Sequence, residues 1–274
     1  MTGEVSATGQ EPLDTIDVTV PHSARIWNYW LGGKDNFAID REVGDQFRKI
    51  FPDIVGVARA SRGFMVRSVR YLAAEAGIRQ FLDIFPTLPL ADNTHEVAQA
   101  VAPASRIVYV DSDRQVLVYA RALLTSGPAG ATEYVEAGVR EPDRILRAAA
   151  RTSLDFTQPV ALLLNGALGH VPDDTEAHAI VRRLLGGVPS GSYLVFNEST
   201  NVVRGAEFAE AMKLWNVAGS APYCLRGPEQ IASFFDGLEL VEPGVVSCPR
   251  WRPDPGQPAA APDVDAFGGV GRKP

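Results

Sequence analysis

Residues 80–111, QFLDIFPTLPLADNTHEVAQAVAPASRIVYVD, decide the fold. The stretch begins with a short apolar run at 80–85 and ends with another at 106–111. Between them, residues 92–102 have the apolar spacing of an amphipathic helix and start with polar residues suited to capping. A strand, a helix and a second strand in this order predict two parallel strands joined by a helical crossover.

The same alternation continues toward the C-terminus. Further strands are predicted at 132–137, 159–165, 192–199, 238–243 and 245–251, and further helices at 113–125, 141–151, 173–186, 204–218 and 228–235. Apolar strands separated by helices are typical of a parallel sheet that is covered on both faces. Only Gly244 separates the last two strands, so we expect them to pair as an antiparallel edge hairpin. The sequence therefore predicts a doubly wound α/β domain over 78–252.

The segments outside this domain have a different character. Residues 21–77 contain no convincing strand and show helical spacing in pieces, which predicts an N-terminal helical addition that caps the sheet. Residues 1–20 are polar and lack aromatic side chains. Residues 253–274 are rich in Pro, Gly and Ala. Both ends are therefore expected to be flexible tails.

Composition excludes several classes of function. The 274 residues carry a formal net charge of −7, which argues against a nucleic-acid or membrane-surface partner. No apolar run approaches the length of a membrane helix, and the first residues do not resemble a secretory signal. Cys224 and Cys248 are too few for a thiolate metal site, so we expect no metal and a cytoplasmic location. Nothing in the sequence indicates the oligomeric state.

Acidic residues stand near the ends of the first two predicted strands, where sheets of this kind bind their ligands. Asp83 lies near the end of the first strand, and Asp111 ends the second. A carboxylate in the latter position suits a ribose diol, because it accepts hydrogen bonds from both hydroxyls. The alternative is a role at the start of the next helix, although Asp113 could cap that helix alone.

The loop after the fourth strand offers a further candidate. Asn165 ends a buried strand and is placed to present its amide to a ligand, and His170 follows in the next turn. The ordinary pKa of histidine suits a general base at neutral pH. The alternative is a loop histidine bonded only to the backbone.

Longer motifs resemble a known family. The string PHSARIWNYWLGGKDNFAIDRE (21–42), the segment HEVAQAVAP (95–103) and the segment RIVYVDSD (106–113) are similar to a group found in actinomycetes. These are S-adenosylmethionine-dependent methyltransferase-like proteins, long classed as a domain of unknown function. The resemblance covers roughly residues 21–254 and implies a class I methyltransferase sheet with an antiparallel last hairpin.

The resemblance also implies a set of ligand contacts. S-adenosylmethionine would lie over the ends of the first two strands, and a small molecule would accept the methyl group. The residues implied in cofactor binding are Asp83 and Phe85 toward the methionine part, Asp111 and Ser112 toward the ribose, Ala137 and Gly138 beside the adenine, Asn165 at the fourth strand, and Tyr29, Gly33 and Asn36 in a cover.

The chain departs from the family's usual pattern in the cofactor loop. Phe85-Pro86-Thr87 stands where the family usually carries Gly-Thr-Gly, and Gly138 replaces a common acidic residue. Two hypotheses follow: an S-adenosylmethionine-dependent methyltransferase of small molecules, or a divergent binding or regulatory protein with lost or altered cofactor binding. A nicotinamide oxidoreductase is a third, which the missing glycines disfavour.

Overall fold

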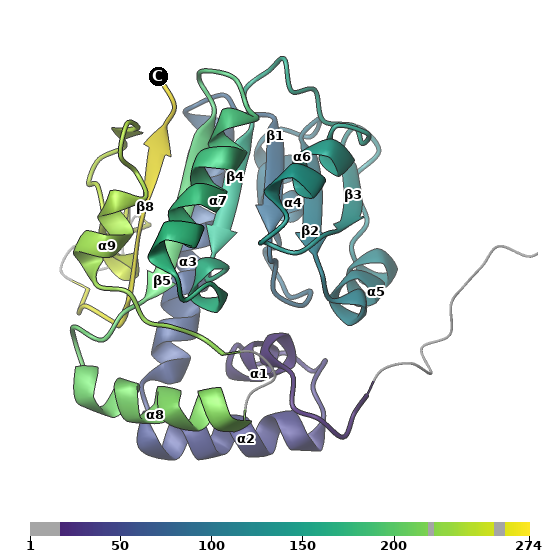
Figure 1. Ribbon diagram of the computed structural model, residues 1–274. Coiled ribbons are helices and arrows are strands. Elements are labelled where there is room, and N and C mark those ends of the chain that lie inside the picture. The colour runs from purple at the N-terminus through teal and green to yellow at the C-terminus, as the bar shows by residue number, and fades with distance from the viewer. Residues whose placement is uncertain (1–16, 219–221, 255–260) are drawn as a thin grey trace, which may run out of the picture.

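An eight-stranded sheet forms the centre of the computed structural model, which describes residues 17–218, 222–254 and 261–274 (Figure 1). Within these residues the strand order is β3-β2-β1-β4-β5-β8-β6, and β7 pairs with β8. The strands are β1 (Gln80–Ile84), β2 (Arg106–Asp111), β3 (Ala131–Glu136), β4 (Ala161–Asn165), β5 (Tyr193–Ser199), β6 (Glu239–Leu240), β7 (Val246–Ser247) and β8 (Ala266–Arg272).

The order of the strands reverses at β1. This strand lies between β2 and β4 and is parallel to both, while β8 runs antiparallel to β5. The chain therefore builds β2 and β3 on one side of β1, and β4 and β5 on the other. Such a reversal leaves a crevice at the carboxyl ends of the strands, where ligands bind. The predicted class, a doubly wound and mostly parallel α/β sheet, is confirmed.

Helices cover both faces of the sheet. Successive residues of each strand point to opposite faces, and where both sets of side chains are apolar each face has to be covered. In β1, Phe81 packs into the core on one face, whereas Leu82 and Ile84 pack into the core on the other. The first face carries α3 (Ile54–Ala74), α4 (Thr94–Val101) and α5 (Arg114–Leu123); the second carries α6 (Pro142–Ala149), α7 (Asp174–Gly186) and α9 (Pro228–Ser233). The remaining helices, α1 (Ser23–Trp30), α2 (Ala38–Ile50) and α8 (Gly205–Ala218), lie together beyond the carboxyl ends of the strands (Figure 1).

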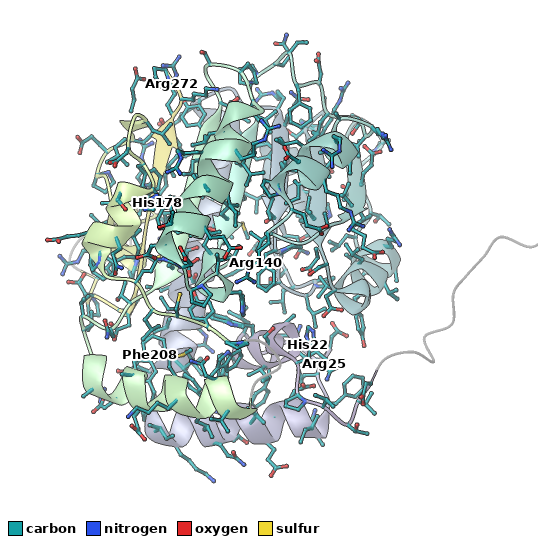
Figure 2. All side chains as sticks on the ribbon, in the orientation of Figure 1. His22, Arg25, Arg140, His178, Phe208 and Arg272 are labelled. Atoms are coloured by element: carbon teal, nitrogen blue, oxygen red, sulfur yellow. The ribbon has the colours of Figure 1, made fainter. Side chains whose placement is uncertain are left out.

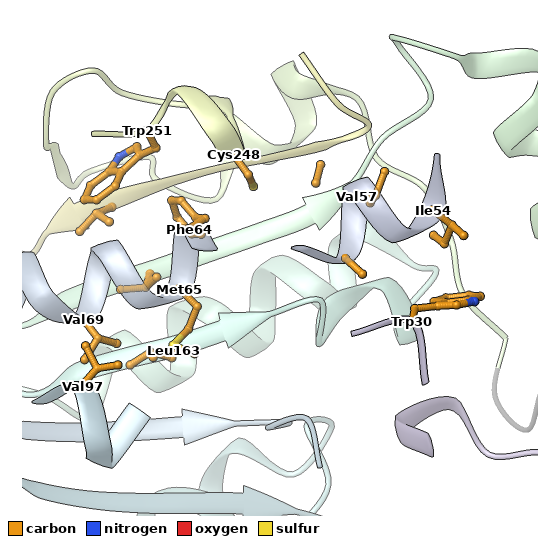
Figure 3. Close-up of a cluster of buried hydrophobic side chains, with 14 of the residues drawn as sticks. Trp30, Ile54, Val57, Phe64, Met65, Val69, Val97, Leu163, Cys248 and Trp251 are labelled. Atoms are coloured by element: carbon orange, nitrogen blue, oxygen red, sulfur yellow. The ribbon is translucent and has the colours of Figure 1, made fainter. Parts of the chain in front are cut away.

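The long helix α3 joins the N-terminal segment to the sheet. Its residue Phe64 belongs to the same buried cluster as Leu163 of β4 and Trp251 near the C-terminus (Figure 3). On the same helix, Arg67 donates from Nε to the carbonyl oxygen of Trp251 at 2.9 Å. The segment 21–77 contains the helices α1, α2 and α3, and it shares one core with the sheet.

The C-terminal segment corrects a prediction. Residues 253–274 are expected above to be a flexible tail, but β8 pairs along its whole length with β5. The strand contains three glycines, at 268, 269 and 271, which favour a loop when judged by strand propensity. A Cβ atom on Gly268 would lie 2.5 Å from the Cβ of Asn197 on β5. The close approach of β8 to β5 therefore explains the glycine-rich composition of β8, which is the reason that the sequence pattern did not predict a strand here.

The predicted edge hairpin is also wrong. Its two strands shrink to the dipeptides β6 and β7, and each of them pairs with β8 instead of with the other. The antiparallel part of the sheet is thus completed by the last residues of the chain.

Part of the predicted tails lies outside the described residues, namely 1–16 and 255–260. Among the residues that are described, no helix combines the length and apolar character that crossing a membrane requires.

Candidate active site

A cavity opens at the carboxyl ends of β1, β4 and β5, under α1 and α3. The figures place α1 across the ends of these strands: His22 and Arg25 lie there, whereas Arg272 lies at the opposite end of the sheet (Figure 2). Polar lining comes from strand ends, from α1 and α3, from the loops after β1 and β4, and from the segment after α8; the residues are Ser23, Ser61, Arg62, Asp83, Thr87, Asn165, His170, Asn197, Glu198, Ser199 and Tyr223. The apolar lining includes Trp27, Met65 and Phe85.

Asp83 lies buried at the floor of this cavity. Its Oδ2 accepts a hydrogen bond of 2.6 Å from Thr94 Oγ1. Burial raises the pKa of Asp83 to about 6, although the bond from Thr94 and the charge of Arg62 act in the other direction. The carboxyl group therefore gains from any hydrogen-bond donor or cation that enters the cavity.

Arg62 joins α3 to the loop after β1. Its guanidinium donates to Thr87 Oγ1 at 3.2 Å and to Asn93 Oδ1 at 3.1 Å. Its Nε is buried and has no hydrogen-bond partner among the described residues. The sequence did not single out Arg62, because it belongs to a helix that lies outside the strand-end segments along the chain. Only the packing of α3 against the sheet brings it to the cavity.

The loop after β1 keeps the backbone shape of a glycine turn. Phe85 has a φ of 67°, a left-handed conformation that glycine adopts most readily. Its backbone N–H donates to the carbonyl of Val110 at 2.8 Å. The ring lies 4.9 Å from the imidazole of His170, measured between centroids. The side chain thus packs toward the turn after β4.

His170 stands between two aromatic rings, Phe85 and Tyr223, with the second centroid 5.1 Å away. Its Nδ1 lies 2.9 Å from the carbonyl oxygen of Pro222. Because a carbonyl only accepts, Nδ1 carries the proton and Nε2 carries a lone pair. Burial lowers the pKa of His170, so the ring is neutral at pH 7. His170 therefore has the form that a general base needs.

A buried acid fixes the turn that carries His170. Glu198, on β5, accepts a 2.9 Å hydrogen bond from the backbone N–H of Gly169 and another from the hydroxyl of Tyr223. Burial raises the pKa of Glu198 to about 7. A Cβ on Gly169 would lie 2.1 Å from the Tyr223 ring, so only glycine permits this contact. Tyr223 was not predicted, since it follows α8 in a segment with no regular pattern.

Two carboxamide oxygens of the lining are buried without a hydrogen-bond partner among the described residues. They are Oδ1 of Asn165, at the end of β4, and Oδ1 of Asn197, on β5. The Nδ2 of Asn197 donates to Ser61 Oγ of α3. Buried acceptors in a folded protein are nearly always paired. The arrangement therefore favours a ligand that brings N–H or O–H donors.

A second group of predicted residues meets at the ends of β2 and β3. The backbone N–H of Ala137 donates to the carbonyl of Asp111 at 3.0 Å. A Cβ on Gly138 would lie 3.8 Å from the Cβ of Ser112. Asp111 accepts a 2.8 Å bond from the backbone N–H of Asp113, and burial raises the pKa of Asp111 to about 7. These four predicted residues do not line the cavity at β1, β4 and β5.

The start of the N-terminal segment covers this second group. The imidazole Nε2 of His22, which precedes α1, contacts the carboxylate of Asp113. The charge of His22 also acts to lower the pKa of Asp111. Residues at the beginning of α1 thus lie over the end of β2, while Trp27 of the same helix reaches the main cavity.

The residues expected in a cover lie elsewhere. Tyr29 donates its hydroxyl to Asp45 at 2.8 Å, on the side of α1 that faces α2. Asn36 donates from Nδ2 to the carbonyl of Gly33 at 2.9 Å and to Asn28 Oδ1 at 3.0 Å. These bonds close the turn after α1. None of the three predicted residues lines the cavity, and their cofactor contact stays a prediction.

The described part of the chain contains no group of three or more His, Cys, Asp or Glu side chains arranged to hold a metal ion.

The chain matches known proteins over almost its whole length. A family model described as S-adenosyl methyltransferase matches residues 9–274. A crystal structure of a DUF574 family protein from Streptomyces avermitilis MA-4680 is 44% identical over 94% of this chain and 99% of that one, with a TM-score of 0.88. A crystal structure of a protein from Thermobifida fusca YX is 38% identical over 94% of this chain and 96% of that one, with a TM-score of 0.85.

More distant structures share only the fold. PigF with SAH is 13% identical over 88% of this chain and 72% of that chain, with a TM-score of 0.51. Among curated proteins, no match was found. The family model spans the sheet, the N-terminal helices and the cavity between them. The chain therefore belongs to the S-adenosyl methyltransferase family.

Proposed function

We propose that this protein methylates a small molecule in the cavity beneath α1, with S-adenosylmethionine held across the ends of β1 and β2. The observation that carries the proposal is the pair of buried carboxyl groups, Asp83 and Asp111, at the ends of the neighbouring parallel strands β1 and β2, the first of which is the strand where the order reverses. Between them runs the turn in which Phe85 keeps a glycine-like backbone.

The residues present fit this cofactor. Asp111 would accept hydrogen bonds from the ribose hydroxyls, and Ala137 and Gly138 would flank the adenine. Asp83 and the unpaired oxygen of Asn165 would accept from the methionine ammonium group. Arg62 would pair with the methionine carboxylate, since its buried Nε has no partner among the described residues. Each unsatisfied group thereby finds a partner of the opposite kind.

The chemistry divides between cofactor and chain. When bound, S-adenosylmethionine supplies a methyl group on a positively charged sulfur. Our proposal assigns His170 to accept the proton of the nucleophile at Nε2, while Glu198 and Tyr223 hold the turn around it. Orientation of this kind accounts for much of the rate enhancement in group transfer.

The two cysteines support a location in the cytoplasm. Cys224 and Cys248 are both free thiols, which is the usual state in a reducing compartment.

Calorimetric titration with S-adenosylmethionine and S-adenosylhomocysteine tests the proposal. We expect binding to the wild-type protein and a loss of about 1.5–3 kcal/mol in Asp111→Asn, the usual value for a hydrogen bond to a charged group. Asp143→Asn is the control, because Asp143 pairs with Arg183 on the exposed surface of α6. Absence of binding by either ligand would instead support the divergent alternative, in which the Phe85-Pro86-Thr87 loop has ended cofactor use.

A further inference from the structure

The polar wall of the cavity at β1, β4 and β5 offers unpaired hydrogen-bond acceptors. Asn165, at the end of β4, and Asn197, on β5, are direct partners in the register of these two parallel strands. Their side chains therefore point to the same face of the sheet and lie next to each other. The Oδ1 atom of each is buried without a partner among the described residues, and Asn197 is only 1% exposed. The wall thus needs donors from a ligand.

Two buried carboxyl groups add to the same wall. Glu198, which is 1% exposed, accepts from the backbone N–H of Gly169 and from the hydroxyl of Tyr223. Asp83 accepts from Thr94 Oγ1. A carboxylate has about four lone-pair positions, so both groups keep capacity for further hydrogen bonds. Burial favours their neutral forms, and a cation in the cavity would favour the charged forms.

Hydrogen-bond donors on the wall are already engaged. Among the described lining residues, Arg62 alone carries a permanent positive charge, and its guanidinium donates to Thr87 and Asn93. The hydroxyl of Tyr223 is bonded to a buried acid, and Nδ1 of His170 is bonded to a backbone carbonyl. An anionic ligand would therefore meet acids and few free donors. An ammonium group fits better, because it has three N–H donors and no acceptor.

We propose that the methyl acceptor is an alkylamine whose amino group enters this cavity as an ammonium cation and donates hydrogen bonds to Asn197 Oδ1 and to Glu198. This inference rests on the proposed function and names its substrate class. Asp83 and Asn165 remain for the ammonium group of the cofactor, so each ammonium group has its own pair of acceptors. Trp27 also lines the cavity, and the face of an indole attracts cations.

The size of the cavity suits the amino end of a ligand. Its volume is about 90 Å³, whereas a single water needs about 10–15 Å³ on the same measure. The cavity is open to solvent, so the rest of the methyl acceptor can extend outward without displacing core side chains.

The transfer balances without another reactant. The ammonium group first passes a proton to Nε2 of His170 and from there to solvent, which frees the lone pair on nitrogen. The positive sulfur nearby favours this loss, because a like charge disfavours the protonated amine. A bond then forms between nitrogen and the methyl carbon as the bond from that carbon to sulfur breaks, and the electron pair of the broken bond stays on sulfur. The products are an N-methylammonium ion, S-adenosylhomocysteine and one proton.

Three ligands with the same carbon chain test the inference: n-hexylamine, 1-hexanol and hexanoate. Each is titrated calorimetrically into protein saturated with S-adenosylhomocysteine at pH 7, where an alkylamine is protonated as lysine is. We expect saturable binding of hexylamine, binding of hexanol that is weaker by at least about tenfold, and no binding of hexanoate. Equal binding of hexylamine and hexanol would overturn the inference, because contact with the hexyl chain alone would then explain it.

A matched pair of variants locates the ammonium group. Glu198→Gln removes the charge and keeps the shape of the side chain, so hexylamine should bind at least about tenfold more weakly while hexanol changes little. Glu210→Gln is the control, because it makes the same change of charge on the exposed surface of α8, where Glu210 pairs with Lys213. Asn197→Leu should cause a similar loss and serves if Glu198→Gln does not fold. Wild-type affinity for hexylamine in both Glu198→Gln and Asn197→Leu would overturn the inference.

The cofactor titration separates this inference from the proposed function. If S-adenosylhomocysteine binds and hexylamine does not, the substrate class is wrong and the methyltransferase proposal stands. If S-adenosylhomocysteine does not bind, both proposals fail.

Discussion

Phe85 departs from an ordinary loop, because it is one of the described non-glycine residues with a positive φ. Bulky residues rarely adopt a positive φ, and the left-handed conformation costs a residue that bears a Cβ about 1–2 kcal/mol. Strain of this kind persists where neighbouring contacts determine the backbone. Here the N–H of Phe85 is bonded to Val110, and its ring packs against His170. Packing at the site thus maintains the turn.

Two substitutions at this position separate the backbone from the side chain. Phe85→Gly and Phe85→Ala both remove the ring, but only glycine tolerates the left-handed conformation. We expect the glycine variant to be more stable than the alanine variant by about 1 kcal/mol in urea unfolding. The difference is no larger because glycine loses more conformational entropy on folding, which offsets part of the strain that it avoids. Equal stabilities would show that the turn leaves the left-handed region once the ring is gone.

The sequence pattern predicted polar residues near the ends of strands. It missed residues of the cavity lining that only tertiary packing brings there. Asp83 and Asp111 lie near the ends of β1 and β2, as predicted, because strand ends in a doubly wound sheet converge on one edge; their contact with a cofactor stays a prediction. Arg62 and Tyr223 belong to a helix and to an irregular segment, and nothing local in the sequence relates them to that edge. Their positions depend on how α3 and the chain after α8 pack against the sheet.

At the scale of elements, β8 shows how tertiary contact overrides propensity. Its glycines lie where side chains would collide with β5 and with neighbouring residues: a Cβ on Gly271 would meet Phe235 at 2.8 Å. The sequence pattern identifies strands by their apolar and β-branched residues. A strand such as β8, in which glycines allow close approach to the neighbouring strand, is therefore not identified. The fold class was predictable because β1 to β5 follow the usual pattern.

A matched pair of glycine substitutions tests this explanation. Gly268→Ala places a Cβ 2.7 Å from the carbonyl oxygen of Phe196 and 2.5 Å from the Cβ of Asn197. We expect a loss of about 1–3 kcal/mol in the free energy of unfolding, the usual range for overpacking. Gly186→Ala, in α7, meets nothing within 4 Å and should be neutral or stabilising by up to about 1 kcal/mol. A Gly268→Ala variant as stable as wild type would contradict the explanation.

At the scale of the whole molecule, the site lies in the seam where the N-terminal helices close over the sheet. Asp83, Asp111 and Glu198 are buried near this seam, and in each case burial raises the pKa of the carboxyl group: to about 6 for Asp83 and about 7 for Asp111 and Glu198. The folded pKa of each group is above its unfolded pKa. Its contribution to the stability of the folded state is therefore lost as the pH rises from the unfolded pKa through the folded pKa. The protein thus gives up stability near neutral pH to keep acids at the strand ends, where ligand donors can bind them.

Stability as a function of pH tests this arrangement through Glu198, whose carboxyl group is fully buried on β5. Between the unfolded pKa of about 4.3 and the folded pKa, the folded chain holds a proton that the unfolded chain has lost. Its contribution therefore falls as pH rises through that window and is constant above it. Glu198→Gln cannot titrate, so its free energy of unfolding relative to wild type should increase on the order of 2 kcal/mol between about pH 5 and 8. Asp143→Asn should show no such trend, and a difference that is constant with pH for Glu198→Gln would mean that the buried acid is ionised throughout.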